Sequence, residues 1–157
     1  MKLALGNDHA GYKLRKVAIE VATDLGYEIV DFGTTDELAV YTTPIAEKVA
    51  NYVVKNQEKG LLICGSGVGM SIAANKVPGV RCVCCSDLFT CESSRLHNNT
   101  NILALGSRVV NLATAENLIR RWLQAEYEGG RREIAYDLIT ELEEKYLKVS
   151  VRSLTKK

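Results

Sequence analysis

Short apolar segments alternate with longer segments of helical periodicity along the chain. The apolar segments predict five strands, at residues 3–6, 28–32, 60–64, 81–85 and 102–105. The stretches between them are long enough for helices. This alternation is typical of successive β-α-β units, so the pattern predicts an α/β fold with a five-stranded parallel sheet.

Apolar positions in the intervening segments repeat with the spacing of a helix that buries one face. Gly26 is suited to end the first helix, Pro44 to the first turn of the second, and Asn111 to an N-cap. The buried faces predicted for the first helix and for the last two consist of Leu14, Val17, Ala18, Val21 and Leu25; of Leu112, Ala115, Ile119 and Leu123; and of Ala135, Leu138, Ile139, Leu142 and Tyr146.

Five strands wound in this way most often take the order 2-1-3-4-5, which reverses direction between strands one and three. Ligands bind in such sheets outside the carboxyl ends of the strands at that reversal. The loops leaving strands one and three are residues 7–9 and 65–69. Topology therefore predicts that these two polar, glycine-rich loops lie together and form a ligand site.

The composition is that of one compact domain. The chain has 157 residues, 46% of them apolar and 25% charged, and its formal net charge is +1. We expect a single domain over residues 1–147 followed by a short basic tail, 148–157. So small a net charge favours neither nucleic acid nor an anionic membrane as a partner, and no apolar run approaches the roughly 18 residues of a membrane span.

Cysteine usage points to a reducing compartment. The five cysteines are an odd number, which does not suggest a disulfide framework. Cys82, Cys84 and Cys85 lie in an apolar run, where we interpret them as buried structural thiols. The start of the chain has no leader-like pattern, so we expect a soluble, unprocessed protein in the cytoplasm.

The loop at residues 65–69 could hold an anion. It takes a strand into a helix expected at residues 71–76, and its three glycines let main-chain amides approach a ligand closely. The simpler alternative is a tight turn without a ligand. A dinucleotide site is a weaker alternative, because that fingerprint requires glycine where Met70 stands and usually follows the first strand.

Several side chains near the predicted loops could do chemistry. Cys64 ends a strand beside the loop amides, where a helix dipole would favour a thiolate, although a buried structural cysteine is an equal alternative. His9 could bind phosphate or move a proton. His97 precedes the fifth strand and could reach the site only from a neighbouring subunit. The best fixed cations for a phosphate are Arg108, Arg131 and Arg132.

Five segments in order resemble the type B ribose-5-phosphate isomerases and their relatives, the galactose-6-phosphate and allose-6-phosphate isomerases. The resemblance covers nearly the whole chain. The segments are GNDHAG at 6–11, CGSGVGMSIAANK at 64–76, SRLHN at 94–98, NILALGSR at 101–108 and YEGGR at 127–131.

The resemblance implies a flavodoxin-like, three-layer αβα sandwich that acts as a homodimer or tetramer with sites shared between subunits. The implied reaction, in carbohydrate metabolism and the pentose phosphate pathway, interconverts ribose 5-phosphate and ribulose 5-phosphate through a cis-enediolate, without metal or cofactor. The implied catalytic residues are Cys64 as the base, Ser66 at the oxyanion, Asp8 in proton movement and His97 in ring opening. The implied substrate-binding residues are His9, Tyr41, Gly65, Gly67, Val68, Gly69, Asn98, Arg108, Arg131 and Arg132.

Two segments depart from the family pattern. Relatives place a histidine after the glycine-arginine pair and a second phosphate-binding arginine at the position of Ala135, whereas here Arg132 follows Arg131 and could replace the missing arginine. The substrate-facing loop of relatives commonly reads Asp-Tyr-Pro, but residues 40–44 read VYTTP. Both changes lie where the sugar and its phosphate would be recognised.

Three alternatives remain open on the sequence. One is the same chemistry on another sugar phosphate, such as allose 6-phosphate, galactose 6-phosphate or a tetrose 4-phosphate. Another is a non-catalytic phosphate- or nucleotide-binding domain, which would leave Cys64 and His97 without a role. The third is a thiol redox protein, but Cys64 has no second cysteine at C-x-x-C spacing.

Overall fold

The computed structural model describes residues 1–36 and 38–146, and its centre is a sheet of five parallel strands. The strands are β1 (Lys2–Asn7), β2 (Glu28–Asp31), β3 (Lys59–Cys64), β4 (Cys82–Cys84) and β5 (Ile102–Gly106). The helices are α1 (Tyr12–Asp24), α2 (Thr42–Asn56), α3 (Val68–Ala74), α4 (Leu88–Asn98), α5 (Leu112–Gln124) and α6 (Glu133–Tyr146), with a 3-10 turn, η1 (Gly130–Arg132), before α6. The predicted tail, 148–157, lies outside the described residues.

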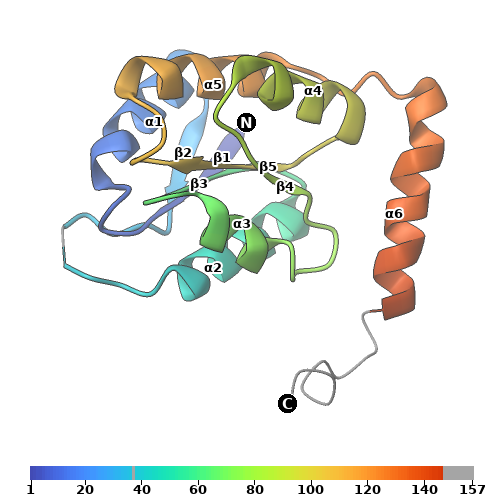
Figure 1. Cartoon of the computed structure of the whole chain (residues 1–157), viewed down its shortest axis with the longest axis horizontal. Coiled ribbons are helices and arrows are strands. Elements are labelled where there is room, and N and C mark those ends of the chain that lie inside the picture. Colours follow the sequence, from blue (N-terminus) through green and yellow to red (C-terminus); the bar gives the residue numbers. More distant parts are fainter. Residues whose placement is uncertain (37, 147–157) are drawn as a thin grey trace.

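Helices cover both faces of the sheet. Figure 1 shows α1, α4 and α5 on one face and α2 and α3 on the other. The predicted α/β fold with a three-layer αβα sandwich is therefore confirmed. No helix in the described ranges is both long and apolar enough to cross a bilayer.

The strand order is β2-β1-β3-β5-β4, so the predicted order was wrong for the last two strands. All five residues of β5 are buried, and it pairs with β3 from Gly60 to Cys64. The three-residue β4 has a burial pattern that falls from buried to exposed, which suits an edge. The longer apolar strand thus takes the interior position between β3 and β4, and the short strand takes the edge. The reversal between β1 and β3, on which the predicted site depends, is unchanged.

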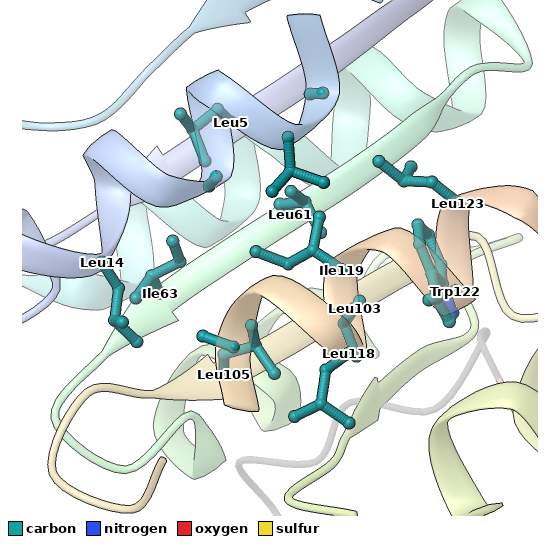
Figure 2. Close-up of a cluster of buried hydrophobic side chains, with 14 of the residues drawn as sticks. Leu5, Leu14, Leu61, Ile63, Leu103, Leu105, Leu118, Ile119, Trp122 and Leu123 are labelled. Carbon is teal, nitrogen blue, oxygen red and sulfur yellow. The ribbon is translucent and has the colours of Figure 1, made fainter. Parts of the chain in front are cut away.

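The core on the face covered by α1 and α5 contains most of the residues predicted to be buried in these two helices. Figure 2 shows strand residues such as Leu5, Leu61 and Leu103 packed against α1 and α5. Trp122 of α5 is fully buried, and its Nε1–H donates to the hydroxyl of Thr100 at 3.0 Å.

Two predicted end signals are present in the structure. Gly26 follows α1 with a φ of +81°, which only glycine adopts readily. The Asn111 carboxamide oxygen accepts the N–H of Thr114 at 2.8 Å and caps α5, as predicted. Leu112, in the first turn of α5, is exposed rather than buried, because it lies before the helix reaches the sheet.

The last helix does not bury the face predicted for it. Leu138, Leu142 and Tyr146 are 53%, 55% and 58% exposed, and Ala135 and Ile139 are exposed as well. Figure 1 shows α6 standing to one side of the sandwich. It touches the body through a hydrogen bond from the Gly79 N–H to the Glu143 carboxylate, 2.8 Å, and through the Tyr136 ring. No residue in the ranges 1–36 and 38–146 covers its apolar face.

Candidate active site

The turn after β1 lies directly against the end of β3. The Asp8 N–H donates to the carbonyl of Ile63 at 3.1 Å. A side chain at Gly11 would collide with that same carbonyl oxygen, so glycine is required for the close approach. The loops that follow β1 and β3 are therefore neighbours, as the predicted reversal requires.

The carboxylate of Asp8 is held in place by this turn. Asp8 is buried, and its Oδ1 accepts the Gly11 N–H at 2.9 Å. The preceding residue, Asn7, is fully buried and donates its Nδ2–H to the carbonyls of Asp8, 3.1 Å, and Thr34, 2.9 Å. Asn7 thereby joins the turn to the loop after β2. Sequence reasoning gave Asn7 no separate role.

The glycine loop wraps around the sulfur of Cys64. Cys64 is the last residue of β3 and is 5% exposed, and the Gly67 N–H points at its Sγ over 3.1 Å. Gly67 has a φ of +80°, and a Cβ there would lie 2.7 Å from the Cys84 sulfur. Ser66 is exposed, and its hydroxyl accepts the Val68 N–H at 3.3 Å. Helix α3 begins at Val68, earlier than predicted.

Two other cysteines near the loop, Cys82 and Cys84, have raised pKa values that favour the thiol form. Burial raises the pKa of Cys82 to about 12. Desolvation, together with the neighbouring thiols of Cys85 and Cys64, also raises the pKa of Cys84. Cys82 and Cys85 are buried as interpreted, but Cys84 is exposed because its strand forms the sheet edge.

A basic cavity adjoins the two loops. Its volume is about 500 Å³, and it is lined by His9, Ala10, Lys13, Leu14, Ser107, Arg108, Val110, Asn111 and Leu112. The Arg108 side chain packs beside Gly65, and the main-chain N–H of Arg108 donates to the Gly65 carbonyl at 3.0 Å. The Ser107 hydroxyl donates to the Ala10 carbonyl at 2.7 Å, which ties the loop after β5 to the turn after β1.

Within one chain the structure brings together Asp8, His9, the segment from Cys64 to Gly69, and Arg108. Gly65 is partly buried and Gly69 is exposed in this loop. Tyr41 is 89% exposed just before α2, and the neighbouring Val40 N–H points at the His9 Nδ1 over 3.4 Å. Tyr41 is thus near the site without being packed into it.

Four predicted residues lie elsewhere. His97 and Asn98 end α4, which starts beyond the carboxyl end of β4 and so finishes at the amino end of the sheet. Arg131 and Arg132 belong to η1, and the Arg132 Nε–H donates to the Glu128 carboxylate at 3.1 Å. That carboxylate also lies 3.9 Å from the His97 Nε2. These residues form a second group, away from Cys64.

Sequence reasoning missed Lys13, Ser107 and Asn111 as cavity-lining residues. Lys13 lies in the first turn of α1, shortly after the turn that carries His9, and no spacing in the sequence marked it as a site residue. Asn111 was predicted only as a helix cap. The cavity places this cap, and the amino end of α5 behind it, beside three basic side chains, an arrangement that favours an anion.

The site combines a buried thiol, a buried carboxylate, main-chain amides and cations. A base beside fixed hydrogen-bond donors can remove a proton next to a carbonyl and hold the resulting oxyanion. The adjoining cations can bind a phosphate. In the ranges 1–36 and 38–146, no group of three or more His, Cys, Asp or Glu side chains is placed to hold a metal ion.

The sequence of this chain matches a known protein family and curated relatives over most of its length. The family model described as Ribose/Galactose Isomerase matches residues 3–139. Ribose-5-phosphate isomerase B of Escherichia coli is 42% identical over 145 residues, which cover 92% of this chain and 97% of the relative. D-erythrulose-4-phosphate isomerase of Pectobacterium atrosepticum is 34% identical over 133 residues, covering 83% of this chain and 87% of the relative.

Comparison with solved structures gives the same family as the sequence comparisons. The structure of ribose-5-phosphate isomerase B from Clostridium thermocellum superposes with a TM-score of 0.90 at 44% identity, covering 93% of this chain and 99% of that chain. The chain therefore belongs to the ribose/galactose isomerase family, and it is a sugar-phosphate isomerase. The predicted resemblance is confirmed, and the interpretation as a non-catalytic binding domain is set aside.

Proposed function

We propose that this enzyme interconverts ribose 5-phosphate and ribulose 5-phosphate, with Cys64 as the base that carries a proton between C1 and C2. The observation that carries the proposal is the position of the Cys64 sulfur, buried at the end of β3 and facing the Gly67 N–H at 3.1 Å. The name of the E. coli relative supports the pentose substrate. No metal takes part in the proposed reaction.

The glycine loop would stabilise the charge that develops on the substrate. Proton removal beside a carbonyl places negative charge on its oxygen, and fixed donors at that position lower the barrier. We assign this task to the loop amides from Gly65 to Gly69 and to the exposed hydroxyl of Ser66. Asp8 would relay protons among the sugar oxygens from its buried position beside Gly11.

The phosphate would bind in the basic cavity. His9 and Arg108 line it from two different loops, and arginine's planar fork matches phosphate oxygens. The His9 Nδ1 faces the Val40 N–H, which leaves Nε2 to donate to a ligand. Tyr41, exposed beside this loop, would close over the sugar.

A second copy of the chain would complete each site. His97 and Asn98 lie far from Cys64 within one chain, because α4 ends at the opposite end of the sheet. Arg131 belongs to η1, which follows Glu128, the residue beside His97. The uncovered apolar face of α6 supports this dimer, since burying it against a partner would remove its exposed leucines from water. In the dimer, His97 would open the sugar ring, Asn98 would hold a hydroxyl and Arg131 would reach the phosphate.

We further propose that the enzyme works in the cytoplasm. All five cysteines are free, and four of them are buried. A reducing compartment keeps such thiols, including the proposed base Cys64, from oxidation. Loss of activity under mild oxidants, restored by a reducing agent, would support this assignment.

The first experiment is a substrate comparison in the presence of EDTA. Ribose 5-phosphate, erythrose 4-phosphate, allose 6-phosphate and galactose 6-phosphate are each incubated with the enzyme and assayed for the corresponding ketose. Highest kcat/KM on ribose 5-phosphate is expected. Preference for the tetrose would support the second candidate, which the Pectobacterium relative and the altered loop at 40–44 favour.

The shared site is tested by mixing two inactive variants, Cys64→Ala and His97→Ala. If His97 comes from the partner, each mixed dimer has one site with both native residues. Random mixing should then restore about a quarter of wild-type activity, since about half the dimers are mixed and each has one working site of two. A mixture that stays inactive after subunit exchange, confirmed by native mass spectrometry, contradicts the shared site.

A further inference from the structure

We infer that Lys13 is a phosphate-binding residue of this enzyme and that it supplies the second strong cation of the phosphate site from within the same chain. The inference rests on the proposed function and names a residue that selects the phosphorylated end of the substrate.

The cavity gives Lys13 a position beside the other proposed phosphate ligands. His9, Lys13 and Arg108 are its three basic lining residues, and no Asp or Glu is among the residues that line it. The remaining polar lining comes from Ser107 and the helix cap Asn111. A cavity with this lining has positive potential and fits a phosphate dianion.

Unlike the two basic residues nearest to it on α1, Lys13 is not paired with a carboxylate of the described residues. The guanidinium of Arg15 is paired with Asp31, and the Lys16 ammonium lies 3.8 Å from the carboxylate of Glu20. Lys13 has no ion pair with any residue in the described ranges. The residue one turn further along α1 is Val17, which offers no carboxylate. The charge of Lys13 therefore remains available to a ligand.

Arg132, the other residue that could supply a second cation, is already paired with a carboxylate. The sequence has Ala135 where relatives carry a phosphate-binding arginine, and Arg132 was the expected substitute. In the structure the Arg132 Nε–H donates to the Glu128 carboxylate at 3.1 Å, so this guanidinium already has an anionic partner. Lys13 has no such partner in the described ranges, and it is therefore a better candidate than Arg132 to join Arg108 and the proposed Arg131 of the partner subunit at the phosphate.

The test compares Lys13→Met with Lys16→Met, which removes the same charge from the same helix outside the cavity. For Lys13→Met we expect KM for ribose 5-phosphate and Ki for inorganic phosphate to rise by about tenfold, with kcat within about twofold. Lys13→Arg should restore most of the affinity. Lys16→Met and Arg132→Met should each change Ki by less than about threefold.

Equal effects of Lys13→Met and Lys16→Met, or a larger effect of Arg132→Met than of Lys13→Met, would overturn the inference. Failure of the proposed function is distinguishable from this result. If the wild-type enzyme prefers another sugar phosphate, the same variants are compared on that substrate. If it turns over none, calorimetric titration with inorganic phosphate still measures whether Lys13→Met, and not Lys16→Met, weakens binding.

Discussion

The two ends of the parallel sheet hold their cations in different ways. At the amino end, Lys59 donates to the carbonyl of Leu123 at 2.8 Å, and Arg95 donates to the carbonyls of Thr100 and Ala125. At the carboxyl end, the side chains of Lys13 and Arg108 line an open cavity and form no hydrogen bond or ion pair with any residue in 1–36 or 38–146.

This contrast separates cations that stabilise the fold from cations that are available to a substrate. The acceptors at the amino end are main-chain carbonyls: Leu123 lies in the last turn of α5, and Thr100 and Ala125 follow the carboxyl ends of α4 and α5. The nearly buried Arg95 also packs over the ring of Trp122. The cations at the carboxyl end instead face the loops that carry Cys64 and Asp8. Removing a side chain from each end should therefore change different measurements.

The largest effect is expected from Cys64→Ala at the carboxyl end. Loss of the base should lower kcat by about a thousandfold while the unfolding midpoint stays close to that of the wild type. Cys84→Ala, which removes an exposed thiol near the same loop, is the matched control and should retain most activity. Steady-state kinetics on both variants checks this, and a Cys64→Ala enzyme with near-normal kcat would exclude the cysteine base.

Arg95→Met should show the opposite behaviour at the amino end. It leaves the buried carbonyls of Thr100 and Ala125 without their donor, so we expect the free energy of unfolding to fall by about 3 kcal/mol. Urea denaturation followed by circular dichroism measures the change. A variant as stable as the wild type would show that these contacts do not hold the amino end together.

An effect of intermediate size is expected for Arg108→Met, which tests whether a cation at the carboxyl end serves binding rather than stability. Because Arg108 has no carboxylate partner within the described part of the chain, its loss should leave stability within about 0.5 kcal/mol. Loss of a charged hydrogen bond to the phosphate should raise KM by about thirtyfold, or about 2 kcal/mol. Substantial destabilisation of Arg108→Met, measured by the same urea titration, would place this arginine with the structural cations.

The smallest effect is expected for Lys59, whose titration should change how the free energy of unfolding depends on pH. Burial, and then repulsion from Arg95, lowers the pKa of Lys59 from 10.5 to about 8. Folding therefore opposes the charged form, and this destabilisation is fully present below pH 8 and disappears as pH rises toward 10.5. The wild type should gain stability over that interval relative to Lys59→Met. Urea midpoints that change in parallel for the two proteins would contradict the lowered pKa.

The sequence alone determined the features that depend on neighbours along the chain. The existence of the five strands, the Gly26 stop and the Asn111 cap follow from local geometry, and these three features were predicted correctly. The glycine loop was recognisable for the same reason, because positive φ and close backbone approach leave glycine as the suitable residue at Gly67. The family resemblance added the proposed roles of the residues around this loop.

Only the tertiary structure decided which segments meet. The interior position of β5 follows from its pairing with both β3 and β4, and hydrophobic period does not specify a partner strand. The same period on α6 predicted burial, yet its apolar residues are exposed within the described part of the chain. Lys13 and Arg95 are both cations in sequence, and what distinguishes them is whether acceptors from distant elements reach their charges in the folded chain. Such long-range contacts depend on the arrangement of whole elements, which local patterns do not contain.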